Sequence, residues 1–182
     1  PGRMTDPNGV HRDYVYDPLG RVTSIIVRDP AGSAGDAVTS IAYDLEGRVT
    51  SLTRPDTAPL SFTYDLAGRL TAMTTAQGDR IDYTHDAMGN VTRERVILAD
   101  ATVRHDISRT FNALGQLVSE TLGPGRVWSY AWDAAGNLAG TTSPAARATS
   151  QAFDGLARLT TAVAGDGGAE GPHLLRTVKA KA

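Results

Sequence analysis

Bulky and polar residues alternate along much of this chain, and one kind of turn interrupts the alternation. In LSFTY, which begins at Leu60, apolar and aromatic residues alternate with Ser and Thr, and RLTAM from Arg69 follows on the other side of the segment DLAG. Alternation with a period of two is typical of a β-strand that has one more deeply buried face. Asp-x-x-Gly favours a tight turn, because Asp accepts backbone N–H groups at the entry and Gly adopts the left-handed conformation at the exit. The pattern therefore predicts a β-hairpin.

The same unit occurs seven times. Its copies are YDPLGRVT from Tyr16, YDLEGRVT from Tyr43, YDLAGRLT from Tyr64, HDAMGNVT from His85, FNALGQLV from Phe111, WDAAGNLA from Trp132 and FDGLARLT from Phe153. The first residues of successive copies are 27, 21, 21, 26, 21 and 21 residues apart, so a basic period of 21 residues carries insertions at two places. A fixed period in this range indicates a repeat architecture.

Three positions in each copy are predicted to hold the structure: the ring that begins it, the Asp or Asn that follows, and the Gly at the turn. They are Tyr16, Asp17, Gly20, Tyr43, Asp44, Gly47, Tyr64, Asp65, Gly68, His85, Asp86, Gly89, Phe111, Asn112, Gly115, Trp132, Asp133, Gly136, Phe153 and Asp154, the last copy having Ala157 where the others have Gly.

A three-residue loop with a glycine bulge, a common hairpin connection, predicts the cross-strand partners. Asp65 should then face Arg69, and the ring of Tyr64 should face Leu70, with the equivalent ring and aliphatic residue meeting in all seven copies. Counting one residue at a time outward pairs Thr63 with Thr71, and the residue two before the ring with a small or polar one. Those outer pairs are Tyr14/Ser24, Ile41/Ser51, Phe62/Ala72, Tyr83/Arg93, Arg109/Ser119, Tyr130/Gly140 and Gln151/Thr161. One face of each hairpin should be bulky and the other flat, rich in Thr and Ala.

Seven hairpins predict about fourteen strands and no helix. The expected fold class is all-β, with tandem antiparallel hairpins that form one curled sheet, since a wide twisted sheet does not stay flat. Residues 1–164 are expected to be the repeat region, with the G-R-x-T half of a partial copy at Gly2, and 165–182 a Gly-rich linker and basic tail. Because the chain starts within a repeat, we expect it to be a piece of a longer polypeptide.

Composition narrows the possible functions. The chain has 182 residues, of which 41% are hydrophobic, enough for one ordinary domain with a core. Lys and Arg number 18 against 20 for Asp and Glu, so no basic field exists to attract nucleic acid. The absence of Cys excludes a disulfide framework, and the apolar runs are too short to insert into a membrane.

No motif predicts catalysis, a metal or a cofactor. The histidines, which are His11, His85, His105 and His173, lack metal-ligand spacing, and His85 occupies a ring position where packing is favoured. His105 beside Asp106 could suggest a base and its orienting acid, but no nucleophile accompanies them. The acidic residues of the repeat lack the spacing of calcium-binding β-rolls. Gly123-Pro124-Gly125 lacks the Lys and helix of a phosphate loop and is interpreted as a hairpin end.

The seven phased copies resemble the YD repeats of the Rhs family. That family occurs in bacterial polymorphic toxins, insecticidal toxin complexes and teneurin-like cell-surface proteins, and the resemblance covers residues 2 to about 162. It implies that the chain is part of a β-strand shell that spirals into a hollow container. In the bacterial members the shell encloses or displays a toxic C-terminal domain that is delivered into other cells.

The resemblance also implies partners and a location. The partners would be the rest of the same polypeptide shell and an enclosed effector domain, and the protein would be secreted or delivered extracellularly. The closing core segment of Rhs toxins, with its aspartyl self-cleavage site, has no match here, so no catalytic Asp is assigned. The alternative is a module of a secreted or cell-surface YD-repeat protein that binds carbohydrate or a receptor, with Tyr14, Tyr83, Trp128 and Tyr130 as the candidate stacking rings.

Overall fold

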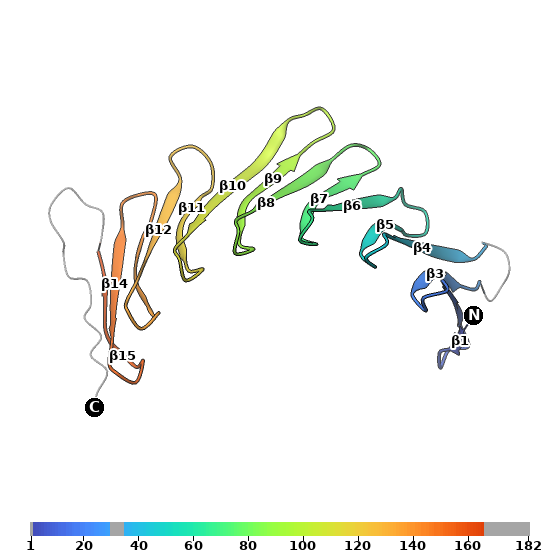
Figure 1. The fold of residues 1–182 in the computed structure, drawn as a ribbon, viewed down its shortest axis with the longest axis horizontal. Helices are drawn as coiled ribbons and strands as arrows, with labels where there is room; N and C mark the ends of the chain where they lie inside the picture. The colour runs from blue at the N-terminus through green and yellow to red at the C-terminus, as the bar shows by residue number, and fades with distance from the viewer. Residues whose placement is uncertain (1, 30–34, 166–182) are drawn as a thin grey trace. The chain divides into compact units, whose positions relative to one another are not determined.

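The computed structural model describes residues 2–29 and 35–165, and these residues form fifteen β-strands and no helix (Figure 1). The strands are β1 (Gly2–Thr5), β2 (His11–Tyr16), β3 (Val22–Val27), β4 (Ala37–Tyr43), β5 (Val49–Thr53), β6 (Leu60–Tyr64), β7 (Leu70–Thr75), β8 (Arg80–His85), β9 (Val91–Ile97), β10 (Val103–Phe111), β11 (Leu117–Thr121), β12 (Val127–Trp132), β13 (Leu138–Thr142), β14 (Ala148–Phe153) and β15 (Leu159–Ala164). No helix long and apolar enough to cross a membrane occurs in this described part of the chain.

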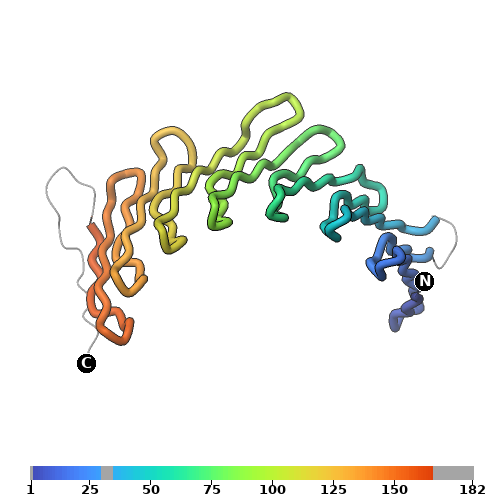
Figure 2. Tube along the Cα trace, viewed as in Figure 1, coloured from blue at the N-terminus to red at the C-terminus, as the bar shows by residue number. Residues whose placement is uncertain are grey.

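The strand order in the sheet is the order in the sequence, from β1 to β15. Each hydrogen-bonded neighbour is therefore also a sequence neighbour, and the chain runs back and forth through successive hairpins (Figure 2). The predicted all-β class with tandem antiparallel hairpins is confirmed. The strand beyond the predicted fourteen is β1, which comes from the partial copy at the start. The predicted tail, apart from Gly165, lies outside the described residues.

Every repeat turns in the predicted way. At the third copy the Asp65 N–H donates to the Arg69 carbonyl at 2.9 Å, and the Gly68 N–H donates to the Asp65 carbonyl at 3.0 Å. Gly68 has a φ of 79°, which is the left-handed conformation that closes a three-residue hairpin loop. The same pair of backbone bonds recurs at all seven copies.

Each ring lies opposite its predicted aliphatic partner wherever the register is defined. The pairs are Tyr16/Val22, Tyr43/Val49, Tyr64/Leu70, Phe111/Leu117, Trp132/Leu138 and Phe153/Leu159. The pairing of His85 with Val91 stays a prediction. Thr63 and Thr71 also meet, with their hydroxyl oxygens 3.0 Å apart.

Beyond the ring, the predicted register was wrong by one residue. A β-bulge follows each ring pair, so Thr63 lies opposite Ala72, and Phe62 lies opposite Met73 instead of Ala72. A bulge places two residues of one strand against one residue of the other, and a simple count outward from the turn does not include this extra residue. The corrected pairs are Tyr14/Ile25, Ile41/Leu52, Phe62/Met73, Arg109/Glu120, Tyr130/Thr141 and Gln151/Ala162.

The bulge makes the bulky face more apolar than predicted. Leu52 now joins Ile41 and Leu60 in one cross-strand row, and Met73 joins Phe62 and Ile81 in the next. The opposite face is flat: along β6, Ser61 and Thr63 are exposed while Leu60, Phe62 and Tyr64 are half-buried. The predicted division into a bulky and a flat face therefore holds. Because of the bulge, large side chains lie opposite other large side chains, where the count outward from the turn had placed small ones.

The sheet is a single layer in the residues that the structure describes. In this part of the chain, Ile107 and Asp13 alone are buried, each 9% exposed, and no side chain is completely enclosed. The composition would allow an ordinary core, but the apolar residues instead form half-buried rows on one face. Stability must therefore come from contacts between neighbouring strands and repeats.

The chain divides into two compact units. Among the described residues, the first comprises 2–29, 35–82 and 96–102, and the second comprises 83–95 and 103–165. Within the second unit, the strand direction turns between β10 and β14 (Figure 1), as expected of a twisted sheet.

Candidate functional site: the hairpin tips

The Asp or Asn at the start of each tip closes its own turn. One carboxylate oxygen of Asp65 accepts the backbone N–H groups of Ala67 at 2.9 Å and Arg69 at 3.0 Å, while the other accepts Nε of Arg69 at 2.7 Å. Asp17 accepts the same three hydrogen bonds from Leu19 and Arg21, and Asp154 accepts them from Leu156 and Arg158. The backbone hydrogen bond from the following Arg, helped by its side chain, lowers the pKa of Asp17, Asp65 and Asp154.

Copies without this Arg keep the same geometry with amides. Asn90 and Asn137 donate side-chain N–H groups to Asp86 and Asp133, each at 2.9 Å. In the fifth copy both partners are amides, and Asn112 donates to the Gln116 side chain at 2.7 Å. Replacement of the Arg by Asn or Gln therefore keeps one side-chain hydrogen bond across the tip, between a carboxylate and an amide in the fourth and sixth copies and between two amides in the fifth.

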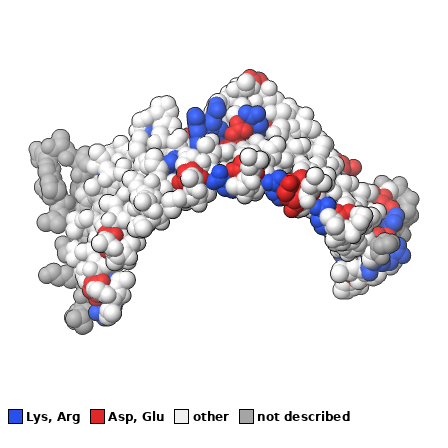
Figure 3. Space-filling view, viewed as in Figure 1, with Lys and Arg blue, Asp and Glu red and all other residues white. Residues whose placement is uncertain are grey.

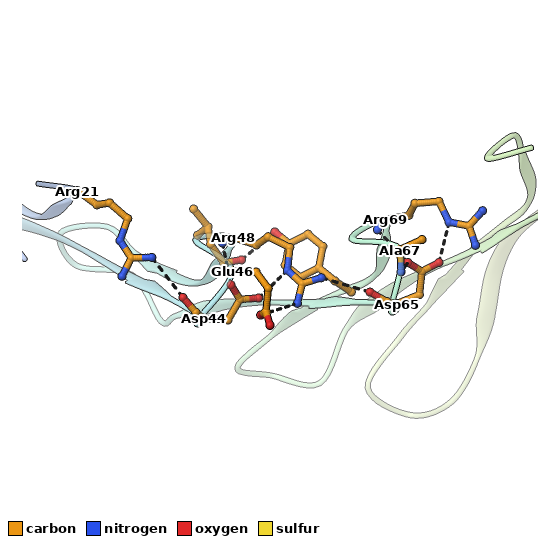
Figure 4. A network of polar contacts seen from close by, with 9 residues as sticks. Arg21, Asp44, Glu46, Arg48, Asp65, Ala67 and Arg69 are labelled. Carbon is orange, nitrogen blue, oxygen red and sulfur yellow. Dashed lines mark hydrogen bonds and ion pairs between the residues drawn. The ribbon is translucent and has the colours of Figure 1, made fainter. Parts of the chain in front are cut away.

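Two tip arginines of the first unit also bind the next repeat. Nη1 of Arg21 donates to the backbone carbonyl of Asp44, and Nη1 of Arg48 donates to that of Asp65, each at 3.2 Å (Figure 4). The Arg21 guanidinium lies 4.6 Å from the centre of the Tyr43 ring, and that of Arg48 lies 4.9 Å from the Tyr64 ring. These distances allow cation–π attraction, worth about 0.5–1 kcal/mol at exposed sites.

The rings complete the connection by donating backward to the preceding repeat. The Tyr43 hydroxyl donates to the Val22 carbonyl and the Tyr64 hydroxyl to the Val49 carbonyl, both at 2.8 Å. In the second unit, Nε1 of Trp132 donates to the Leu117 carbonyl at 2.7 Å. We call this set of contacts between consecutive tips, made by an Arg or ring side chain of one repeat and a backbone carbonyl of the next or preceding one, the tip ladder.

The tip ladder was not predicted from the sequence. Its partners lie 15 to 23 residues apart, and hairpin counting relates only residues within one turn. A usable signal was present, however: Tyr and Arg occupy the same two positions of the motif in each of the first three copies.

Several charged groups away from the tips form ion pairs within their own part of the sheet. Asp13 accepts both Nε and Nη2 of Arg3, at 2.7 and 3.0 Å, and Nε of Arg28 at 2.8 Å. These bonds hold the pKa of Asp13 far below its usual range. On the bulky face of the second unit, Arg109 bonds Glu120 at 2.8 Å and lies 3.8 Å from Glu94. Basic and acidic groups are accordingly interspersed on the face shown in Figure 3.

The histidine and acid considered for base chemistry do not form a pair. His105 and Asp106 are consecutive residues of β10, so their side chains project to opposite faces. Asp106 is bound by Arg93 at 2.6 Å and has Arg95 3.7 Å away. The hydrogen bond from Arg93 lowers its pKa. Asp106 is thus part of an ion pair with arginine.

The other candidate groups lie in structural settings. His85 ends β8 at the ring position and is half-buried, as are Tyr14, Tyr83, Trp128 and Tyr130. Among the described residues, no three His, Asp or Glu side chains come together as metal ligands. The arrangement at the tips can hold repeats together, because Arg21 and Arg48 donate to backbone carbonyls of the next repeat.

Comparison of this chain with known protein families and solved structures also indicates a repeat protein. The RHS repeat family model matches residues 3–34, 43–80, 64–96 and 111–148. This chain belongs to the RHS repeat family. No match was found among curated proteins.

Solved structures with a similar fold include a chain of a Tc holotoxin and a chain of a TcdB2-TccC3 complex. A chain of the Photorhabdus luminescens Tc holotoxin pore is 14% identical, with a TM-score of 0.65, and the match covers 86% of the RHS repeat chain. A chain of a TcdB2-TccC3-Cdc42 structure is also 14% identical, with a TM-score of 0.67 over 90% of the chain. At such identities the likeness shows a shared fold. The RHS repeat chain spans 9% of the length of each of these two chains.

Proposed function

We propose that this RHS repeat chain is a structural segment of a β-shell and acts as a scaffold without chemistry of its own. The observation that carries the proposal is the tip ladder, in which the polar groups of one tip bind the backbone of the next. The single-layer sheet, with its bulky face only half-buried, is the form expected of a wall segment.

We further propose that the shell encloses or displays a C-terminal effector. The protein would be secreted or delivered outside the producing cell, and the effector would enter other cells. Support comes from the fold shared with Tc toxin chains, one of which is described as lacking a hypervariable C-terminal region. The chain's partners would then be the remainder of its own shell and the enclosed effector.

Carbohydrate or receptor binding has less support. The rings expected to stack on sugars lie in the half-buried rows of the bulky face, where Tyr14 faces Ile25 and Tyr130 faces Thr141. We therefore retain the shell role as the conclusion.

The shell role is tested by the state of the bulky face in the isolated chain. At a concentration low enough for the chain to be monomeric, an environment-sensitive apolar dye should bind and fluoresce, and urea should unfold the chain in a broad transition. Both results follow from a wall segment whose apolar rows lack their final cover. A chain that leaves the dye dark and unfolds in one sharp transition would be a closed domain, and the shell role would be abandoned.

A further inference from the structure

A hollow lies beside the start of β10, within the second unit. The paired parts of β10 and β11 end at Ser108 and Thr121, so residues 103–107 of β10 extend beyond the end of β11. Residues 103–106 of β10 and residues 122–124 and 126 of the loop before β12 line the hollow, whose volume is about 440 Å³. The extra length of β10 therefore forms one wall of a cavity, and the loop forms the other. We call it the β10 hollow.

The β10 hollow has a positive charge that the chain does not neutralise. Arg104 lines it from the strand and Arg126 from the loop, and neither side chain makes a hydrogen bond or ion pair with another described residue. The acid in the lining is Asp106, and its two carboxylate oxygens already accept Nε and Nη2 of Arg93, at 2.8 and 2.6 Å. Nε of Arg95 lies 3.7 Å from the same carboxylate and has no hydrogen-bond acceptor. Asp106 therefore leaves the charge of Arg104 and Arg126 in place.

The hollow at the other insertion has the opposite balance of charge. It lies in the first unit, where β4 extends beyond the last pair of β4 and β5, between Ser40 and Thr53. Among the described residues, its charged lining consists of one arginine, Arg54, and two acids, Asp36 and Asp56. The positive charge is therefore a particular property of the β10 hollow and does not follow from an insertion as such.

The loop wall adds backbone donors. Gly123 and Gly125 have φ values of 113° and 69°, and a Cβ on either would meet no atom within 4 Å, so the space above both is open. The Leu122 and Arg126 N–H groups close the loop, whereas those of Gly123 and Gly125 have no acceptor among the described residues. Free N–H groups in a turn with left-handed residues are suited to bind an anion.

These donors favour a sulfate or phosphate group as the ligand. A guanidinium matches the paired oxygens of such a group, and a single unpaired surface arginine would need no explanation. Two of them in one cavity, with free backbone donors in the same loop, point to an anion that can accept from both walls. Binding cavities for small molecules have volumes of about 300–1,000 Å³, so the β10 hollow has room for more than a bare ion.

We propose that the β10 hollow binds a sulfate or phosphate group, either free or carried as an ester on a sugar-sized molecule. The proposal goes beyond the shell role and does not depend on it. Recognition is by the charged group, and the rings considered above for stacking on sugars take no part. The few charges involved suit one small ligand and remain too few for a nucleic-acid backbone.

The test measures binding of sodium sulfate and of glucose sulfate to the isotope-labelled chain at constant ionic strength. Both ligands should shift the amide resonances of Gly123 and Gly125 and reach saturation. Arg104→Gln and Arg126→Gln should each weaken binding about tenfold, the usual loss for one charged hydrogen bond. The matched control is Arg147→Gln, which removes the same charge 21 residues further on, at the equivalent loop position outside the hollow, and should change affinity less than twofold.

The outcomes separate a built site from general attraction of anions. Tighter binding of glucose sulfate identifies an esterified ligand, equal binding identifies the free ion, and both support the site. Equal losses in Arg126→Gln and Arg147→Gln, equal shifts with unsulfated glucose, or no saturation in the wild type would each overturn it. Arg104 and Arg126 have no partner in the described chain, so both variants should keep the wild-type circular dichroism. The dye measurement above judges the shell role separately.

Discussion

At the scale of the residue, the repeat depends on backbone conformation more than on side-chain identity. The ring is Tyr, His, Phe or Trp in different copies, and amides replace one or both members of the Asp–Arg pair in three of them, yet the turn-closing residue is Gly in six of seven copies. The exception, Ala157, keeps a left-handed φ of 58° and the same hydrogen bond to Asp154, at 2.9 Å. A residue with a Cβ is strained by about 1–2 kcal/mol in this conformation. The seventh turn is therefore less stable than the six turns that have Gly.

Ala157→Gly should therefore stabilise the chain by about 1 kcal/mol. The control is Ala67→Gly, one residue before a turn glycine and outside the left-handed region, where the extra freedom of the unfolded chain should destabilise instead. Urea midpoints of both variants against the wild type measure the difference. Equal effects of the two substitutions would show that the strain at Ala157 is absent.

At the scale of the element, one hairpin is joined to the next by a few polar contacts along one edge and by the strand ladder elsewhere. The ring hydroxyl is the simplest of these contacts to isolate. Tyr64 donates to the Val49 carbonyl, whereas Tyr16 makes no such bond to the residues that the structure describes. Phe111 and Phe153 occupy the same position without a hydroxyl, so the repeat tolerates its loss.

Tyr64→Phe should cost about 0.5–1.5 kcal/mol, the net value of one hydrogen bond, because it leaves the Val49 carbonyl without its donor. Tyr16→Phe should leave stability unchanged within experimental error. Chemical denaturation of both proteins is the measurement. If the two substitutions lower the free energy of unfolding equally, the hydrogen bond from Tyr64 to Val49 does not stabilise the contact between repeats.

The tip carboxylates make the hairpins sensitive to acid. The pKa values of Asp17, Asp65 and Asp154 are lowered in the folded chain, so near pH 4 the unfolded chain binds more protons. Their contribution is present above about pH 4 and is lost as pH falls through the folded-state values. Melting temperatures between pH 6 and pH 3 should fall, and less so when all three are replaced by Asn, the residue found at position 112. An identical decline in both proteins would place the acid sensitivity elsewhere.

At the scale of the whole molecule, the sequence was enough to predict the architecture but not the contacts between repeats. Period, turn chemistry and alternation predicted antiparallel hairpins and the pairing of Tyr64 with Leu70. They missed the bulge after each ring, because Thr71 fits the alternating pattern equally well as an ordinary strand residue. They also missed the Arg48 contact with Tyr64, because side-chain reach across repeats is decided by how the hairpins stack.

The absence of a closed core in the described residues follows from the same architecture. In the described residues the strands form one sheet in sequence order, and no second layer covers its bulky face. Stability then accumulates repeat by repeat, through interfaces that are nearly alike. The composition, which would suit an ordinary globular domain, carries no information about this.

The tip ladder also bears on how such a gene can change. Arg21 and Arg48 donate to a backbone carbonyl of the next repeat, and Tyr43 and Tyr64 donate to a backbone carbonyl of the previous one. A carbonyl is present whatever the side chain, so one repeat recognises little of its neighbour's identity. Recombination that duplicates or removes a whole period would join two repeats that had never been adjacent, and the same bonds could form at the new junction. Family members can therefore lengthen or shorten by whole repeats while the individual copies diverge in sequence.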